Sequence, residues 1–144
     1  MRQATSRKSG LSVGIKRDAA DSWFSKCIRL RAEWRCESCH KQYDSSSTGL
    51  HCAHIYGRAN KSTRWDEGNA LALCYACHQR YTANPLDFRA FLERYLGEGH
   101  LELLNERRNR IFKTTKAIRD EIAKHYREEF RRMEETNKRD LVGY

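Results

Sequence analysis

The sequence has no long apolar run and only one proline among its 144 residues. Because a helix needs about 20 apolar residues to cross a bilayer, we expect no membrane span. The N-terminus has positive charges but neither an apolar segment nor a cleavage site, so no signal peptide is predicted. Both absences favour a cytoplasmic protein. The length predicts one domain with a modest core.

Acidic residues are also in deficit, with 19 Asp and Glu against 28 Lys and Arg. The net charge of +9 favours a polyanionic partner, and nucleic acid is the commonest one. On charge alone, a soluble basic protein without such a partner is the alternative. Residues 1–17 carry five basic side chains and no acid, which predicts a disordered basic arm.

Six cysteines are present, and four of them form two C-x-x-C pairs. In a reducing cytosol such pairs indicate a metal site rather than disulfides. Each pair presents two sulfurs from one turn, as tetrahedral zinc requires. We therefore predict a structural Zn²⁺ bound by Cys36, Cys39, Cys74 and Cys77. The 34 residues between the pairs exceed a usual zinc-ribbon loop, so they contain an insert, and histidines lie within it.

Hydrophobic spacing predicts the elements around this insert. Before it, a helix should run from a cap at Asp21 or Ser22 to about Glu33. Within it, residues 50–56 are predicted to be extended. Residues 57–68 are predicted to form a loop rich in Arg, Lys and Asn.

The C-terminal part of the chain is predicted to be helical. Asn84 should cap the first helix there, and Gly97 and Gly99 should end it. Two further helices are expected over residues 100–113 and 115–138. The last one carries an apolar stripe for packing on the body or on a second subunit: Ile118, Ile122, Tyr126, Phe130 and Met133.

Three residues in and beside the insert have the order and neighbours of a known nuclease motif. His54 is followed by an isoleucine, Asn69 precedes a Leu-Cys-x-x-Cys, and His78 directly follows the second cysteine pair. This pattern resembles the HNH (ββα-metal, His-Me finger) endonucleases with a four-cysteine zinc site, of the endonuclease VII type. Parts of residues 51–66 resemble, more narrowly, the NinG (Rap) family of phage recombination proteins. The resemblance covers about residues 20–95.

The resemblance implies an α+β fold, in which a zinc-stapled ββα-metal hairpin is surrounded by mainly α-helical N- and C-terminal segments. It divides the chain into the arm of residues 1–17, a nuclease domain of residues 18–96, and helices of residues 97–144. Those helices either pack on the domain or form a homodimer. The implied activity is divalent-metal-dependent hydrolysis of DNA, on branched recombination intermediates such as Holliday junctions. The implied setting is a phage or prophage in a bacterial cell.

The resemblance also assigns roles that side-chain chemistry supports. His54 is the expected general base, because an unperturbed imidazole titrates at about pH 6.5. Asn69 is expected to orient this base through side-chain bonds to the loop backbone. His78 is expected to bind catalytic Mg²⁺ or Mn²⁺, with Zn²⁺ or Ni²⁺ as other options. For each residue a structural role is the alternative: a satisfied histidine, a turn asparagine or a support for a metal ligand.

One position departs from the family pattern. The residue before the base histidine is usually an Asp or His that also binds the catalytic ion, and here it is Ala53. In an extended strand positions 51 and 53 lie on the same face. We therefore predict that His51 replaces the missing ligand.

The loop after the extended segment carries cations beside the predicted site. Arg58, Lys61 and Arg64 are predicted to hold DNA phosphates, and a solvated loop is the alternative. Trp65 is predicted to be core. Three other functions stay open: a less selective HNH nicking or homing-type nuclease, a zinc-knuckle DNA-binding protein without catalysis, and a zinc-organised protein-interaction module.

Overall fold

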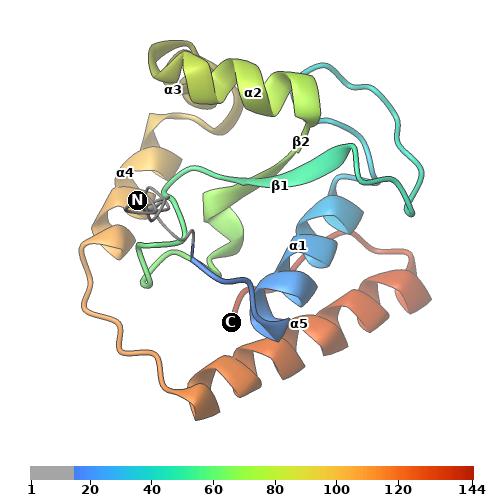
Figure 1. Ribbon diagram of the computed structural model, residues 1–144, viewed down its shortest axis with the longest axis vertical. Helices are drawn as coiled ribbons and strands as arrows, with labels where there is room; N and C mark the ends of the chain where they lie inside the picture. The colour runs from blue at the N-terminus through green and yellow to red at the C-terminus, as the bar shows by residue number, and fades with distance from the viewer. Residues whose placement is uncertain (1–14) are drawn as a thin grey trace, which may run out of the picture.

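Figure 1 shows the computed structural model, which describes residues 15–144, so most of the predicted arm lies outside the described residues. The described residues form five α-helices, a short 3₁₀ helix and a two-stranded sheet. In chain order the elements are α1 (Ala19–Arg31), β1 (Leu50–His54), η1 (Glu67–Asn69), β2 (Ala70–Cys74), α2 (Tyr75–Ala83), α3 (Pro85–Leu96), α4 (Glu98–Arg108) and α5 (Lys116–Thr136). No helix in this part of the chain is both long and apolar enough to span a membrane.

The sheet and the helix after it form a continuous β1–β2–α2 unit. The strands are antiparallel and pair from Leu50 opposite Cys74 to His54 opposite Ala70. β2 is buried along its whole length, and α2 starts at the next residue without a connecting loop. β1 pairs with no other strand among the described residues, so its second edge is free. The predicted α+β class is confirmed.

The helices cover both faces of this small sheet (Figure 1). α1 contacts one face and α5 packs against α1, while α2 contacts both strands from the other side and α3 packs on α2. Two buried clusters follow this layering. One contains Leu73 of β2 with Tyr81 of α2, and the other contains Phe24 of α1 with Tyr126 of α5. The hairpin is therefore held between two helical layers.

The first helix starts earlier than the sequence indicated. Its N-cap is Asp18, whose carboxylate accepts the Asp21 N–H at 3.0 Å, while the Asp21 carboxylate accepts the Asp18 N–H at 2.9 Å. The predicted cap at Asp21 or Ser22 is wrong, because Asp21 is the third helical residue and closes a reciprocal capping box.

Two expectations for the C-terminal helices also change. Gly97 separates α3 from α4, and its φ of 86° suits a residue without a Cβ atom. Gly99 was expected to end a helix but lies within α4. Asn84 occupies the N-cap position of α3 without a side-chain cap bond, and it donates instead to the Arg80 carbonyl at 2.8 Å.

The apolar stripe of α5 is used within the chain. Thr115 caps this helix, and its hydroxyl accepts the Ile118 N–H at 3.2 Å. Ile122, Tyr126 and Met133 are buried in the cluster that α5 shares with α1. Of the two predicted roles of the stripe, the structure shows packing on the body. These buried side chains are therefore not available to the predicted homodimer.

Candidate metal centre and active site

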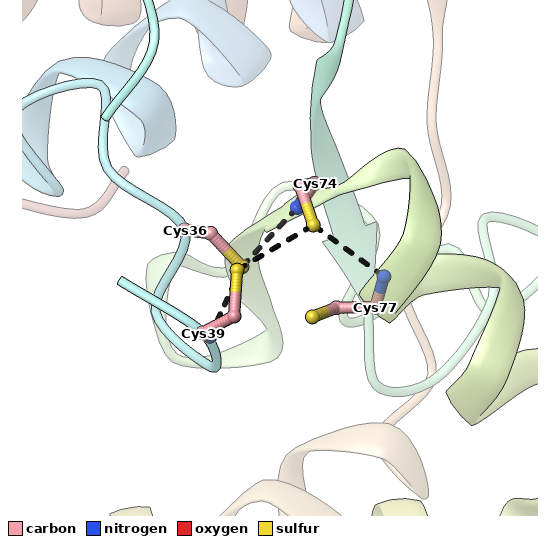
Figure 2. Close-up of side chains that lie close together, drawn as sticks. All are labelled: Cys36, Cys39, Cys74 and Cys77. Carbon is pink, nitrogen blue, oxygen red and sulfur yellow. Dashed lines mark hydrogen bonds between the residues drawn. The ribbon is translucent and has the colours of Figure 1, made fainter. Parts of the chain in front are cut away.

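Two tight turns bring four cysteine sulfurs together, one turn before β1 and one at the junction of β2 and α2 (Figure 2). The ligand atoms of Cys36, Cys39, Cys74 and Cys77 all lie within 4.8 Å of one another. The N–H groups of Cys39 and Cys74 donate to Cys36 Sγ at 3.5 and 3.3 Å, and that of Cys77 donates to Cys74 Sγ at 3.4 Å. Four converging sulfurs form a cluster that can hold one structural metal ion.

The charge of these thiols also favours a bound cation. Burial raises the pKa of Cys74, but the Cys77 N–H and the neighbouring thiols outweigh burial and lower this pKa to about 7. Burial and the hydrogen bond with Cys74 raise the pKa of Cys77 to about 12. Cys74 therefore loses its proton readily, and a positive ion among the sulfurs would favour ionisation of Cys77 as well. Zn²⁺ is an ion that this donor set favours.

A second pair of metal-binding side chains joins β1 to the first turn of α2. The Nδ1 atoms of His51 and His78 lie 3.0 Å apart. Two nitrogens that bind one ion at right angles, each about 2.1 Å from it, are also about 3.0 Å apart. Burial, and then the charge of His51, lower the pKa of His78, which favours the neutral ring that a metal requires. The pair can share an ion, with His51 in place of the ligand missing at Ala53.

His54 ends β1 and packs against Phe24 of α1, with the ring centres 5.8 Å apart. Its Nε2 lies 3.1 Å from the carbonyl oxygen of Arg64. Because a carbonyl only accepts, Nε2 carries the proton and Nδ1 keeps a free electron pair. Burial lowers the pKa of His54 and outweighs the Arg64 carbonyl, which raises it. A neutral imidazole with its proton held on one nitrogen is the form that a general base needs.

The three histidines line one cavity of about 750 Å³. It follows the free edge of β1, with α1 and a serine-rich loop in its walls. Arg17, Arg29 and Arg58 line it alongside the histidines. Asp21, the only carboxylate among the described lining residues, is already paired with Arg64. The cavity therefore brings together imidazole nitrogens that can bind a metal ion, a neutral imidazole that can accept a proton, and positive charge.

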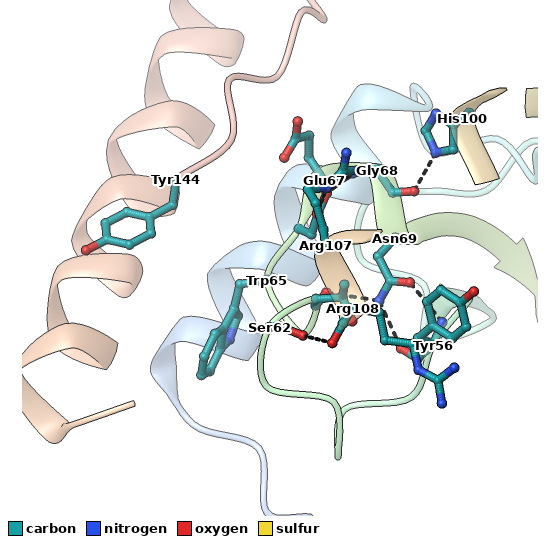
Figure 3. Close-up of polar contacts among 12 residues, drawn as sticks. Tyr56, Ser62, Trp65, Glu67, Gly68, Asn69, His100, Arg107, Arg108 and Tyr144 are labelled. Carbon is teal, nitrogen blue, oxygen red and sulfur yellow. Dashed lines mark hydrogen bonds and ion pairs between the residues drawn. The ribbon is translucent and has the colours of Figure 1, made fainter. Parts of the chain in front are cut away.

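Asn69 holds the backbone of the loop that follows β1 (Figure 3). Its Oδ1 accepts the Tyr56 N–H at 2.8 Å, and its Nδ2 donates to the carbonyls of Tyr56 and Thr63, both at 2.9 Å. Asn69 is completely buried, so water does not compete for these bonds. They are the side-chain bonds to the loop backbone that were expected of Asn69. They hold Arg64, whose carbonyl accepts from His54, next to β1.

The predicted DNA-binding cations take three different positions. Arg58 lines the cavity, and one of its guanidinium nitrogens is buried without a hydrogen-bond partner among the described residues. Lys61 lines a separate, smaller cavity of about 270 Å³. Arg64 is 8% exposed, and its Nε donates to the Asp21 carboxylate at 2.9 Å. The expectation for Arg64 is therefore corrected, because its charge ties the loop to α1 and does not face solvent.

Comparison with protein-family models, with curated proteins and with solved structures finds no match to this chain.

The structure also shows the positions of four further residues near the site, one of which was predicted from the sequence. Trp65 is buried, as predicted. Asp66 is a cap residue of η1, and its carboxylate accepts the Gly68 N–H at 2.9 Å. Arg17 and Arg29 were not assigned to the site. For Arg29 the spacing was the available signal, because positions 21, 25 and 29 of α1 follow one another in steps of four and all line the cavity.

Proposed function

We propose that the protein is a divalent-metal-dependent DNA endonuclease of the HNH type. One observation carries the proposal: the paired Nδ1 atoms of His51 and His78, and the imidazole of His54, belong to the same positively lined cavity. This combination supplies ligands for a divalent cation, a base for water and positive charge for phosphate in one place.

In this proposal His54 Nδ1 takes a proton from a water molecule, whose oxygen forms a bond to phosphorus. The bond from phosphorus to the 3′ oxygen breaks, and solvent protonates that oxygen, leaving 5′-phosphate and 3′-hydroxyl ends. His51 and His78 would hold Mg²⁺ or Mn²⁺, which stabilises the negative charge of the transition state when bound. Arg58 holds a phosphate oxygen. Asn69 fixes the loop backbone, and the loop in turn orients His54 through the Arg64 carbonyl.

The finer features of the proposal rest on the resemblance and on ligand chemistry. The four-cysteine cluster is proposed to hold structural Zn²⁺, because thiolates favour this ion. The likeness of residues 51–66 to the NinG family supports branched recombination intermediates as substrates, and a phage or prophage origin. The second candidate is a zinc-knuckle DNA-binding protein without catalysis. The same positive cavity supports it, and the contact between His51 and His78 would then be a structural hydrogen bond.

Cleavage of a labelled four-way junction, compared with a linear duplex of the same sequence, tests the proposal. Each substrate is incubated with Mg²⁺ and with Mn²⁺, using the wild-type protein, His54→Ala and His125→Ala. His125 is the matched control, because it lies on α5 outside the cavity and its Nε2 donates to the Val142 carbonyl at 2.8 Å.

We expect the wild type and His125→Ala to cut the junction, and His54→Ala to be slower by at least about a hundredfold. Equal cutting of junction and duplex that still depends on His54 would support the nuclease activity and contradict the proposed preference for branched DNA. DNA binding without cleavage under either metal would overturn the proposal in favour of the DNA-binding protein.

A further inference from the structure

Two arginines on the α1 side of the cavity have no acidic partner. Arg17 precedes α1 and Arg29 lies near its end, and both line the cavity. The acids closest to them along the chain, Asp18 and Glu33, are paired with other arginines, and so is Asp21 of the cavity wall. Among the described residues, no carboxylate forms an ion pair with Arg17 or Arg29. Their charge is therefore available to an anion.

Arg29 is held in place before any ligand arrives. Its Nε donates to the Ser25 carbonyl at 3.3 Å, and its guanidinium carbon lies 5.0 Å from the centre of the Trp34 ring. Neither contact uses the two terminal nitrogens, which are the paired donors of the guanidinium fork. Burial lowers the pKa of Arg29, and the nearby charge of Arg17 also lowers it. An anion between the two cations would remove this repulsion.

The two arginines lie beside the proposed active centre. Cys52, between the metal-binding His51 and the base His54 in β1, lines the same cavity. The loop of residues 45–48, three serines and a threonine, forms another part of the wall. Guanidinium and hydroxyl groups are donors that phosphate oxygens accept in protein–DNA contacts. This side of the cavity therefore has the chemistry of a phosphate site, and its one carboxylate among the described residues, Asp21, is neutralised by Arg64.

We propose that Arg17 and Arg29 form a phosphate clamp, which binds the DNA phosphate next to the scissile one. The inference rests on the proposed function and extends it to residues that the sequence argument did not assign. The clamp supplies affinity and fixes the position of the strand along the free edge of β1. The chemical step stays with the histidines.

Binding is measured in the His54→Ala background, so that affinity is read without cleavage. The probes are a labelled duplex and a labelled single strand of the same sequence. The variants are Arg17→Ala, Arg29→Ala and Arg29→Lys, and Arg131→Ala is the matched control, because it removes the same charge from an exposed position on α5. We expect each clamp alanine to weaken binding about tenfold and to reduce the slope of log K against log salt by about 0.7–0.9. Arg29→Lys should keep the slope and lose part of the affinity, since Lys lacks the bidentate fork.

A loss in the clamp variants no larger than in Arg131→Ala would overturn the clamp, even where cleavage depends on His54. DNA binding that depends on the clamp, by a protein that does not cut DNA, would support the clamp and contradict the proposed nuclease activity. Circular dichroism checks the fold of Arg29→Ala, and the exposed Arg17 carries the test alone where that variant unfolds. In cleavage assays the clamp variants should raise KM, because they remove an interaction that binds the strand equally in the ground state and in the transition state. A fall in kcat with an unchanged KM would contradict this binding role.

Discussion

At the scale of single residues, the surroundings of His54 decide when it can act as a base. Burial against α1 lowers its pKa from the ordinary value of 6.5. A base works in its neutral form, so a lowered pKa keeps the residue active further into the acid range. The loop carbonyl of Arg64 fixes which nitrogen is free, and it does so without adding a negative charge that would favour protonation.

The pH dependence of cleavage follows from this arrangement. We expect kcat/KM to be constant between about pH 7 and 8 and to fall by about tenfold per pH unit only below an apparent pKa lower than that of free histidine. The assay contains saturating Mn²⁺, so that the fall in rate at low pH reports protonation of His54 and not loss of the metal ion. A profile that stays flat from about pH 5 to 8 would contradict the role of His54 as the base.

Asn69 offers a prediction about stability. Replacing it with Ala leaves the Tyr56 N–H and the carbonyls of Tyr56 and Thr63 without their partner in a buried site. We expect a loss of about 2–4 kcal/mol in the free energy of unfolding, measured with urea. The control is Asn84→Ala, because Asn84 is exposed, and it should lose no more than about 1 kcal/mol. Equal effects of the two variants would show that the Asn69 bonds do not stabilise the loop.

At the scale of elements, the sequence predicts features that depend on a fixed local spacing. It does not predict features for which several nearby residues are equally suitable. The cysteine pairs and the steps of three and four along α5 are of the first kind, and both are present in the structure. The start of α1 is of the second kind. Asp18, Asp21 and Ser22 are all common cap residues, and only the reciprocal bonds between Asp18 and Asp21 decide among them.

The same distinction explains the site. Strand alternation predicted that His51 and Ala53 share a face of β1, because this depends only on the local geometry of the strand, and the role of His51 as a metal ligand stays a prediction. The fate of Arg64 could not be predicted, since its partner Asp21 lies 43 positions away in the sequence and on another element. Arg17 and Arg29 were missed for the same reason, because a helical spacing does not reveal which strand the helix will face.

The packing of α5 on α1 predicts that a core substitution in α5 destabilises the single chain. Met133 is fully buried, so Met133→Ala should lower the free energy of unfolding by about 2–5 kcal/mol through the lost contacts and the cavity left behind. Arg131→Ala, on the exposed side of the same helix, should change it by no more than about 0.5 kcal/mol. Thermal unfolding at several protein concentrations measures both effects. A melting temperature that rises with concentration would show that α5 also packs between subunits.

At the scale of the whole molecule, the four-cysteine cluster joins the turn before β1 to the start of α2. We expect a chelator to remove the ion and to abolish both the helical circular dichroism signal and cleavage, because a small core depends on such a crosslink. Cys36→Ser should lose the ion, measured as zinc content per chain. Cys27→Ala should keep it, because Cys27 is a buried thiol outside the cluster. A fold that survives complete loss of zinc would contradict this dependence.

Cys77 and His78 are consecutive residues at the start of α2, and in the proposed function they would serve different metal sites. Cys77 belongs to the sulfur cluster, and His78 meets His51 of β1. One helical turn carries both side chains, so the position of His78 depends on how the neighbouring Cys77 is held. For the proposed nuclease we therefore expect an order of maturation in the cell, in which thiophilic metal enters the new chain first and a divalent ion binds at the histidines afterwards. On this proposal a shortage of zinc would silence the protein even where magnesium is abundant.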